Sequence, residues 1–207
     1  FGVFQIEPEK TVDAVRTALD VGYRHIDTAE MYGNEKQVGE GVNGSDVPRD
    51  QVFITSKLNN NHHDYDDAIK ATDQTLADLG VDAVDLFLIH WPLPEVGDFV
   101  DTWKAMEKIY ADGKARAIGV SNFQKHHLER LFAETEIVPA VNQIEVHPYL
   151  TQDDLRAFNA DHGIATEAWS PIAQGDVLDD PVLKKIAEEK GKSTAQVTLR
   201  WHIQRGD

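Results

Sequence analysis

Short apolar segments alternate along the chain with longer segments in which apolar residues recur every three or four positions. The short segments are rich in Val and Ile, which is typical of buried β-strands. They lie roughly 20 to 35 residues apart, the repeat length of a strand followed by a helix. Seven strands are predicted, at Val3–Ile6, Arg24–Thr28, Val52–Leu58, Val84–Trp91, Ala117–Ser121, Val141–Val146 and Ile164–Ser170.

The segments between these strands have the period of amphipathic helices. Pro181 is suited to a first helical turn, with Asp180 before it as the N-cap. Helices are predicted at Thr11–Val21, Asn34–Glu40, Asp67–Leu79, Phe99–Asp112, Gln124–Glu134, Asp153–His162, Pro181–Lys190 and Thr194–Gln204.

The strands read as continuous apolar runs, which indicates a parallel sheet covered by helices. Seven strand–helix units favour an α/β fold of the (β/α)8 TIM-barrel type, with an open doubly wound sheet as the alternative. No linker divides residues 1–207, so we expect a single barrel domain. The chain ends at "LRWHIQRGD", where an eighth strand would begin. We therefore expect a barrel that lacks the eighth strand and C-terminal helices and is incomplete at both ends.

The stretch Gly39–Gly44, "GEGVNG", has the spacing of the G-x-G-x-x-G dinucleotide fingerprint. That fingerprint requires a strand before it and a helix after it, so that the helix N-terminus faces the phosphates. Here a helical segment comes first and a strand follows. We interpret the glycines as a helix C-cap and loop in which glycine supplies positive φ.

The composition of the chain excludes several classes of binding partner. The net charge is -16 and the pI is about 4.8, and such a surface repels nucleic acid and anionic membranes. With no Cys there is neither a disulfide nor thiolate chemistry, which agrees with a cytoplasmic location. Apolar runs such as "VDLFLIHW" are too short to span a bilayer. We expect a soluble monomer that acts on a small molecule.

Polar residues stand at the carboxyl ends of several predicted strands, where functional residues of such barrels gather. Asp27 and Tyr32 follow the second strand, Lys57 ends the third and His90 the fourth. A Lys ammonium beside a Tyr phenol lowers its pKa from about 10, and an Asp keeps that cation in place. A His next to the Tyr can orient a carbonyl oxygen. This combination predicts a proton donor beside an oxyanion site, as carbonyl reduction by hydride requires.

Each of these residues also has a purely structural interpretation, such as a buried salt bridge for Asp27 or a core histidine for His90. A rival enzyme class is a metal-dependent TIM-barrel hydrolase or isomerase built on Asp27, His90, Glu145 and His147, which needs at least three converging ligands. A third possibility is a non-catalytic, cofactor-binding barrel. The carbonyl-reductase interpretation is favoured because Tyr32 and its partners stand at the same ends of successive strands.

Six segments resemble the signature segments of the aldo-keto reductase family: "GYRHIDTAEMYGNE", "FITSKL", "DLFLIHWP", "GKARAIGVSNF", "VNQIEVHPY" and "EAWSPIAQG". The resemblance covers essentially the whole chain and is greatest to the bacterial 2,5-diketo-D-gluconate reductase-like enzymes. It implies an NADPH-dependent oxidoreductase that reduces an aldehyde or ketone to an alcohol and needs no metal.

The resemblance also implies roles for individual residues. Asp27, Tyr32, Lys57 and His90 match the catalytic tetrad, with Tyr32 as the general acid. The cofactor-binding positions comprise three that bond the nicotinamide carboxamide, an indole that stacks on the ring and a turn beside the pyrophosphate; they are Ser121, Asn122, Gln143, Trp169, Ser170, Pro171, Ile172, Gln174 and Gly175. Ser, Asn and Gln carry suitable donors and acceptors, and an indole is a flat platform. A helix cap for Asn122 and a core position for Trp169 are the structural alternatives.

Two departures from the family pattern bear on specificity. The eighth strand and following helix carry a Lys and an Arg for the adenosine 2'-phosphate, and these residues are absent here, so NADPH is preferred by resemblance alone. Asn59 stands where many relatives have Trp. With Phe4 and Trp91 as aromatic walls, Asn59 predicts a wide, wet substrate mouth suited to a small polar dicarbonyl or a keto-sugar acid.

Two histidine pairs complete the candidates. His62 and His63 lie in "NNNHHDYDD", which we interpret as a surface loop rather than a metal site. By the same reasoning, His126 and His127 are placed on a solvated helix.

Overall fold

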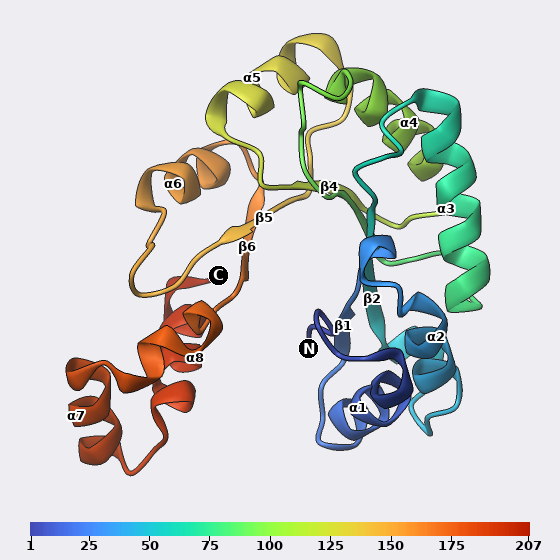
Figure 1. Cartoon of the computed structure of the whole chain (residues 1–207). Helices are drawn as coiled ribbons and strands as arrows, with labels where there is room; N and C mark the ends of the chain where they lie inside the picture. Colours follow the sequence, from blue (N-terminus) through green and yellow to red (C-terminus); the bar gives the residue numbers. More distant parts are fainter.

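Helices cover the outer side of a curled sheet in which all six strands run parallel (Figure 1). The computed structural model describes residues 1–207. Along the sheet the strand order is the same as the order in the chain. A doubly wound sheet would reverse this order at a switch point, so the winding is that of a barrel. The strands are β1 (His25–Asp27), β2 (Phe53–Leu58), β3 (Leu86–Ile89), β4 (Ile118–Ser121), β5 (Val141–Glu145) and β6 (Ala165–Trp169).

All eight predicted helices are present, and most boundaries agree with the prediction to within a few residues. They are α1 (Pro8–Asp20), α2 (Glu35–Asn43), α3 (Tyr65–Leu79), α4 (Phe99–Ala111), α5 (Lys125–Glu134), α6 (Asp153–Asp161), α7 (Pro181–Lys190) and α8 (Thr194–Arg205), with 3-10 turns η1 (Glu30–Tyr32), η2 (Arg49–Gln51) and η3 (Ala173–Asp179). As predicted, the Asp180 side chain caps α7 by accepting from the backbone N–H groups of Val182 and Leu183. None of the eight helices has both the length and the apolar character needed to cross a membrane.

The first predicted strand, Val3–Ile6, is wrong. Only Gly2 forms a bridge, to Asp27, and Val3 donates its N–H to the Asp27 carbonyl at 3.0 Å. The chain then turns at Gln5, whose φ is 62°, and α1 begins almost at once at Pro8. The apolar residues of this segment therefore pack in a turn, where there is no room for a ladder of strand hydrogen bonds.

The prediction for the glycine-rich stretch is partly right. Gly44 is the C-cap of α2, as predicted, but Gly39 and Gly41 lie inside the helix rather than in a loop. Gly44 has φ -93°, so the positive-φ interpretation is wrong. A Cβ on Gly39 would overlap the Leu79 backbone of α3, and one on Gly41 would press on Val15 of α1. These glycines allow close helix packing. The helix-before-strand order that argued against a phosphate site is the order observed.

The main apolar core lies between the sheet and the helices. Ile54 of β2, Phe87 of β3 and Val120 of β4 are fully buried in it, as are Leu79 of α3 and Trp103 of α4. This layer leaves the inner side of the sheet and the carboxyl ends of the strands free for polar side chains. In Figure 1, β1 and β6 are the two edges of the curled sheet, and no hydrogen bond joins them.

Candidate active site

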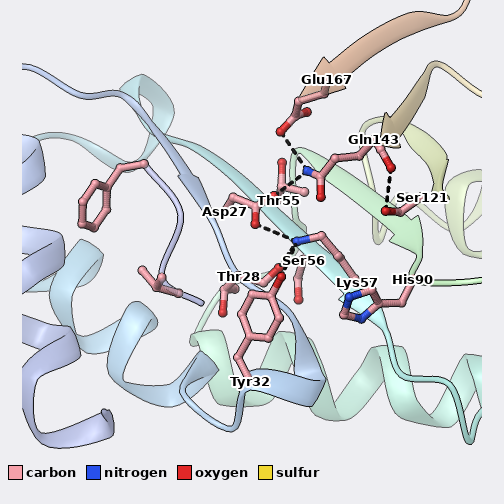
Figure 2. Close-up of polar contacts among 12 residues, drawn as sticks. Asp27, Thr28, Tyr32, Thr55, Ser56, Lys57, His90, Ser121, Gln143 and Glu167 are labelled. Carbon is pink, nitrogen blue, oxygen red and sulfur yellow. Dashed lines mark hydrogen bonds and ion pairs between the residues drawn. The ribbon is translucent and has the colours of Figure 1, made fainter. Parts of the chain in front are cut away.

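Lys57, at the end of β2, is the centre of a buried polar cluster on the inner side of the sheet (Figure 2). Its side chain is 1% exposed. The Nζ atom donates to Asp27 Oδ1 at 2.6 Å, to the Thr28 carbonyl at 2.9 Å and to the Tyr32 hydroxyl at 3.4 Å. All three N–H groups of the ammonium are thus used, which offsets the cost of burying the charge.

The pairing of β1 with β2 explains why these groups meet. Asp27 is in register with Thr55, so Lys57, two residues further along β2, extends from the same face of the sheet. The 3-10 turn η1 follows β1 and returns Tyr32 toward that face. Gly33 ends this turn with φ 68°, a left-handed conformation that glycine adopts without strain.

Burial raises the pKa of Tyr32 above its ordinary value, although Lys57 opposes the shift. The sequence-based expectation of a net lowering is therefore wrong, because desolvation of the phenolate outweighs its attraction to the ammonium. Burial by itself would lower the pKa of Lys57, but Asp27 and Tyr32 together raise it. At neutral pH the cluster accordingly holds a protonated phenol beside an ammonium, and a protonated phenol is what a proton donor requires.

His90 follows β3 directly and is buried beside Tyr32. The two rings meet edge to face with their centroids 5.9 Å apart. Burial, assisted by the charge of Lys57, lowers the pKa of His90 to about 4. Its imidazole is therefore neutral at physiological pH, and its buried Nδ1 has no hydrogen-bond partner within the protein.

A second cluster lies at the ends of β4, β5 and β6. Trp169 donates its indole N–H to Asn122 Oδ1 at 2.8 Å, and the Asn122 amide donates to Ser121 Oγ and to the His90 carbonyl. Ser121 in turn donates to the backbone carbonyl of Gln143 at 2.8 Å. The structure therefore brings together four of the predicted cofactor residues. Asn122 does not cap α5, whose capping box consists of other residues.

Glu167 of β6 belongs to the same region and was missed by the sequence analysis. Gln143 Nε2 donates to Asp27 Oδ2 at 2.8 Å and to Glu167 Oε1 at 2.9 Å, so one amide joins the two clusters. Burial raises the pKa of Glu167, and the nearby Asp27 adds to the shift. An acidic residue two positions before Trp169, on the same face of a strand, was the available signal.

The turn that follows β6 is sharply bent. Ser170, Ala173, Gln174 and Gly175 all have positive φ. The carbonyl of Pro171 accepts a hydrogen bond from His202 of α8 at 2.9 Å. The predicted pyrophosphate residues, Ser170, Pro171, Ile172, Gln174 and Gly175, thus follow Trp169 directly and lie against the C-terminal helices.

Of the three predicted substrate residues, which come from different parts of the chain, Phe4 contacts Tyr32. Phe4 is 61% exposed, and its ring centroid lies 5.0 Å from that of Tyr32. Trp91 follows His90 and is also exposed. Asn59 donates its backbone N–H to a Glu30 carboxylate oxygen at 3.2 Å. A polar depression of about 600 Å³ between the starts of α5 and α6 shares no residue with this region.

The histidine pairs differ from one another. His62 lies on the surface and contacts the carboxylates of Glu30 and Asp67 at 3.1 and 3.0 Å. His63 is buried beside Thr102, so the surface-loop prediction is wrong for this residue. His127 packs on aromatic rings and its Nδ1 accepts from a backbone N–H at the start of α5.

The four residues of the rival metal hypothesis do not form one metal-binding group. Asp27 binds Lys57, and His147 contacts Glu145 at 3.1 Å. In residues 1–207 no group of three or more His, Asp or Glu side chains is arranged so that it could hold a metal ion.

Residues 2–207 match the family model described as "Aldo/keto reductase family". The chain therefore belongs to the aldo/keto reductases, a family of oxidoreductases that act on carbonyl groups. The predicted family, enzyme class and α/β barrel fold are confirmed.

Individual relatives agree with this assignment. The glyoxal reductase of Bacillus subtilis is 50% identical over 206 residues, covering 99% of this chain and 74% of the relative. The crystal structure of an aldo/keto reductase from Brucella melitensis is 50% identical, with a TM-score of 0.95 over 100% of this chain and 80% of the other. A Bombyx mori aldo-keto reductase in complex with NADP is 37% identical, with a TM-score of 0.92 over 100% and 76%.

Proposed function

We propose that the protein is an NADP(H)-dependent reductase that converts an aldehyde or ketone to an alcohol, with Tyr32 as the general acid. The observation that carries this proposal is the buried Lys57 ammonium between Asp27 and the protonated phenol of Tyr32, with a neutral His90 beside it. Membership of the aldo/keto reductase family supports the reaction class.

Tyr32 donates its proton to the alkoxide oxygen that forms when a carbonyl carbon receives a hydride. The phenolate left behind is stabilised by Lys57, whose ammonium is already in contact with the hydroxyl. Asp27 keeps that ammonium charged and oriented inside the barrel. The raised pKa of Tyr32 means that the proton is present at neutral pH and is released only when a strong base, such as an alkoxide, needs it.

His90 positions the substrate by donating a hydrogen bond to the carbonyl oxygen. A neutral imidazole has one N–H donor and one acceptor nitrogen. Its pKa of about 4 keeps it neutral, so that it adds no positive charge beside Lys57. The donor role does not depend on pH above this value.

The polar cluster around Trp169 fits a nicotinamide. A carboxamide needs donors and acceptors in one plane, and Ser121, Asn122 and Gln143 supply both. The Trp169 indole is held at its edge by Asn122, which fixes the ring as a platform. These residues would hold the ring, with Ser170 to Gly175 beside the pyrophosphate, and the bound cofactor would supply the hydride. The NADP complex of the Bombyx mori relative supports this choice of cofactor.

We further propose that the substrate is a small polar dicarbonyl or a keto-sugar acid. The proposal is supported by the polar Asn59 and by the exposed rings of Phe4 and Trp91, which together would form a mouth suited to a hydrated carbonyl compound. The name of the Bacillus subtilis relative, a glyoxal reductase, agrees with a dicarbonyl. The cytoplasmic location, the monomeric state and the single-domain boundaries stay predictions.

The Tyr32→Phe variant tests the central role. Turnover of glyoxal with NADPH should fall by about 10²- to 10⁴-fold, the usual contribution of general acid catalysis, because the proton donor is removed. The dissociation constant of NADPH should stay unchanged, since the aromatic ring remains.

Tyr23→Phe is the matched control, because Tyr23 is an exposed tyrosine that packs on Phe1 away from Lys57. It should have wild-type turnover. Should Tyr32→Phe retain full turnover, the phenol is not the acid.

A further inference from the structure

The side-chain amide of Gln143 is held between two carboxyl groups (Figure 2). Its Nε2 atom lies 2.8 Å from Asp27 Oδ2 and 2.9 Å from Glu167 Oε1. A primary amide nitrogen has two hydrogens, so both are used. These two contacts distinguish the nitrogen of this amide from its oxygen.

The opposite orientation of the amide is unfavourable. It would place the amide oxygen against the Asp27 carboxylate, which is paired with Lys57 and has no proton to donate. The side-chain oxygen Oε1 of Gln143 forms no hydrogen bond within the protein. Gln143 can therefore offer this oxygen to a ligand only as an acceptor.

Strand pairing explains the position of Glu167. Gln143 of β5 is in register with Glu167 of β6, and Ser121 of β4 is in register with Gln143. The three side chains thus form one layer across neighbouring strands. Trp169 lies two residues after Glu167 and extends from the same face of β6.

A carboxyl group at this position is unfavourable for the fold. Burial and the charge of Asp27 both disfavour the ionised form of Glu167, and no Lys or Arg pairs with it. Its only side-chain partner is the Gln143 amide. A half-buried acid whose ionised form is disfavoured, and which has a single side-chain contact, indicates that this contact has a role of its own.

We propose that Glu167 is a positioning residue that, together with Asp27, fixes Gln143 as a hydrogen-bond acceptor and so selects a pyridine ring that bears a primary carboxamide. The inference rests on the proposed function, because it concerns the residue assigned to the nicotinamide. The carboxamide NH2 of a bound nicotinamide would donate to the Gln143 oxygen. An acetyl group in its place has a methyl where that donor should be.

The test compares the dissociation constants of NADP+ and of its 3-acetylpyridine analogue, measured by quenching of protein fluorescence. The wild type should bind the analogue about 3- to 10-fold more weakly than NADP+, because the analogue lacks one hydrogen bond. In Glu167→Met, which retains the length of the side chain but has no strong acceptor, only Asp27 still holds the amide nitrogen, and the ratio should fall below that of the wild type. Glu167→Gln retains an acceptor oxygen and should keep the wild-type ratio.

Glu188→Ala removes an exposed carboxylate from α7 and should leave both constants unchanged. The positioning role of Glu167 is refuted if Glu167→Met keeps the wild-type ratio, if Glu167→Gln loses it, or if the wild type shows no discrimination. If Glu167→Met does not fold, Gln143→Met replaces it. Unchanged discrimination between NADP+ and the analogue in that variant equally refutes the proposal. A wild type that binds neither nucleotide refutes the proposed function instead.

Discussion

At the scale of single residues, the protein buries more acidic groups than its ion pairs account for. Asp27 has Lys57 as its partner, and Asp85 has two arginines. Glu167 and Glu35 have only neutral hydrogen-bond donors. Burial raises the pKa of both carboxyl groups above the ordinary value, so both residues couple folding to pH.

Glu35 gives the clearest pH prediction. It is 5% exposed and accepts hydrogen bonds from Ser56 at 2.5 Å and Thr75 at 3.3 Å, and burial raises its pKa from 4.5 to about 7. Between those values the folded protein holds a proton that the unfolded chain has lost. The contribution of Glu35 to the stability of the folded protein is therefore fully present below pH 4.5 and is lost as pH rises through 7.

Glu35→Gln should remove this dependence, because glutamine is neutral at every pH. The whole pKa shift corresponds to about 3.5 kcal/mol at about 1.4 kcal/mol per pH unit, and most of it falls between pH 4.5 and pH 8. The stability of the variant relative to wild type should therefore increase by about 3 kcal/mol between these two pH values. Denaturant unfolding at both pH values measures the difference. Glu40→Gln, on the exposed side of the same helix, is the control, and an equal effect of Glu35→Gln at the two pH values would contradict the prediction.

At the scale of elements, the period of the apolar residues was enough to place eight helices and six of the seven predicted strands. It failed at Val3–Ile6, because the segment before α1 begins at Pro8 is too short to form a strand paired with β1. It also misjudged the glycines of α2, since a sequence does not show which helix lies against which. Only glycine fits at position 39, because the backbone of Leu79 leaves no space for a side chain, and Leu79 is 40 residues further along the chain.

Gly39→Ala should accordingly destabilise the protein by about 1–3 kcal/mol through overpacking between α2 and α3, although alanine by itself favours a helix by about 1 kcal/mol. Thermal unfolding measures the change. Lys36→Ala, at an exposed position of α2, should stay within about 0.5 kcal/mol of wild type. A Gly39→Ala protein more stable than wild type would show that the two helices separate at little cost.

At the scale of the whole molecule, the sheet winds in one direction and its strands end together. That arrangement brings Asp27, Lys57, Gln143 and Glu167 from four strands into one hydrogen-bonded chain. The site is therefore a property of the curl of the sheet, and no single strand–helix unit contains it. Gln143 and Asp27 are 116 residues apart in the chain.

The sequence by itself determined which elements form and which side chains stand at the strand ends, because periodicity, capping and strand polarity are local properties. It identified Asp27, Tyr32, Lys57 and His90 as one group. Only the tertiary structure decided that burial outweighs the ammonium in setting the pKa of Tyr32, and that Gln143 is held between two carboxyl groups. Desolvation and hydrogen-bond orientation depend on neighbours contributed by distant strands, and a pattern along one chain does not contain those neighbours.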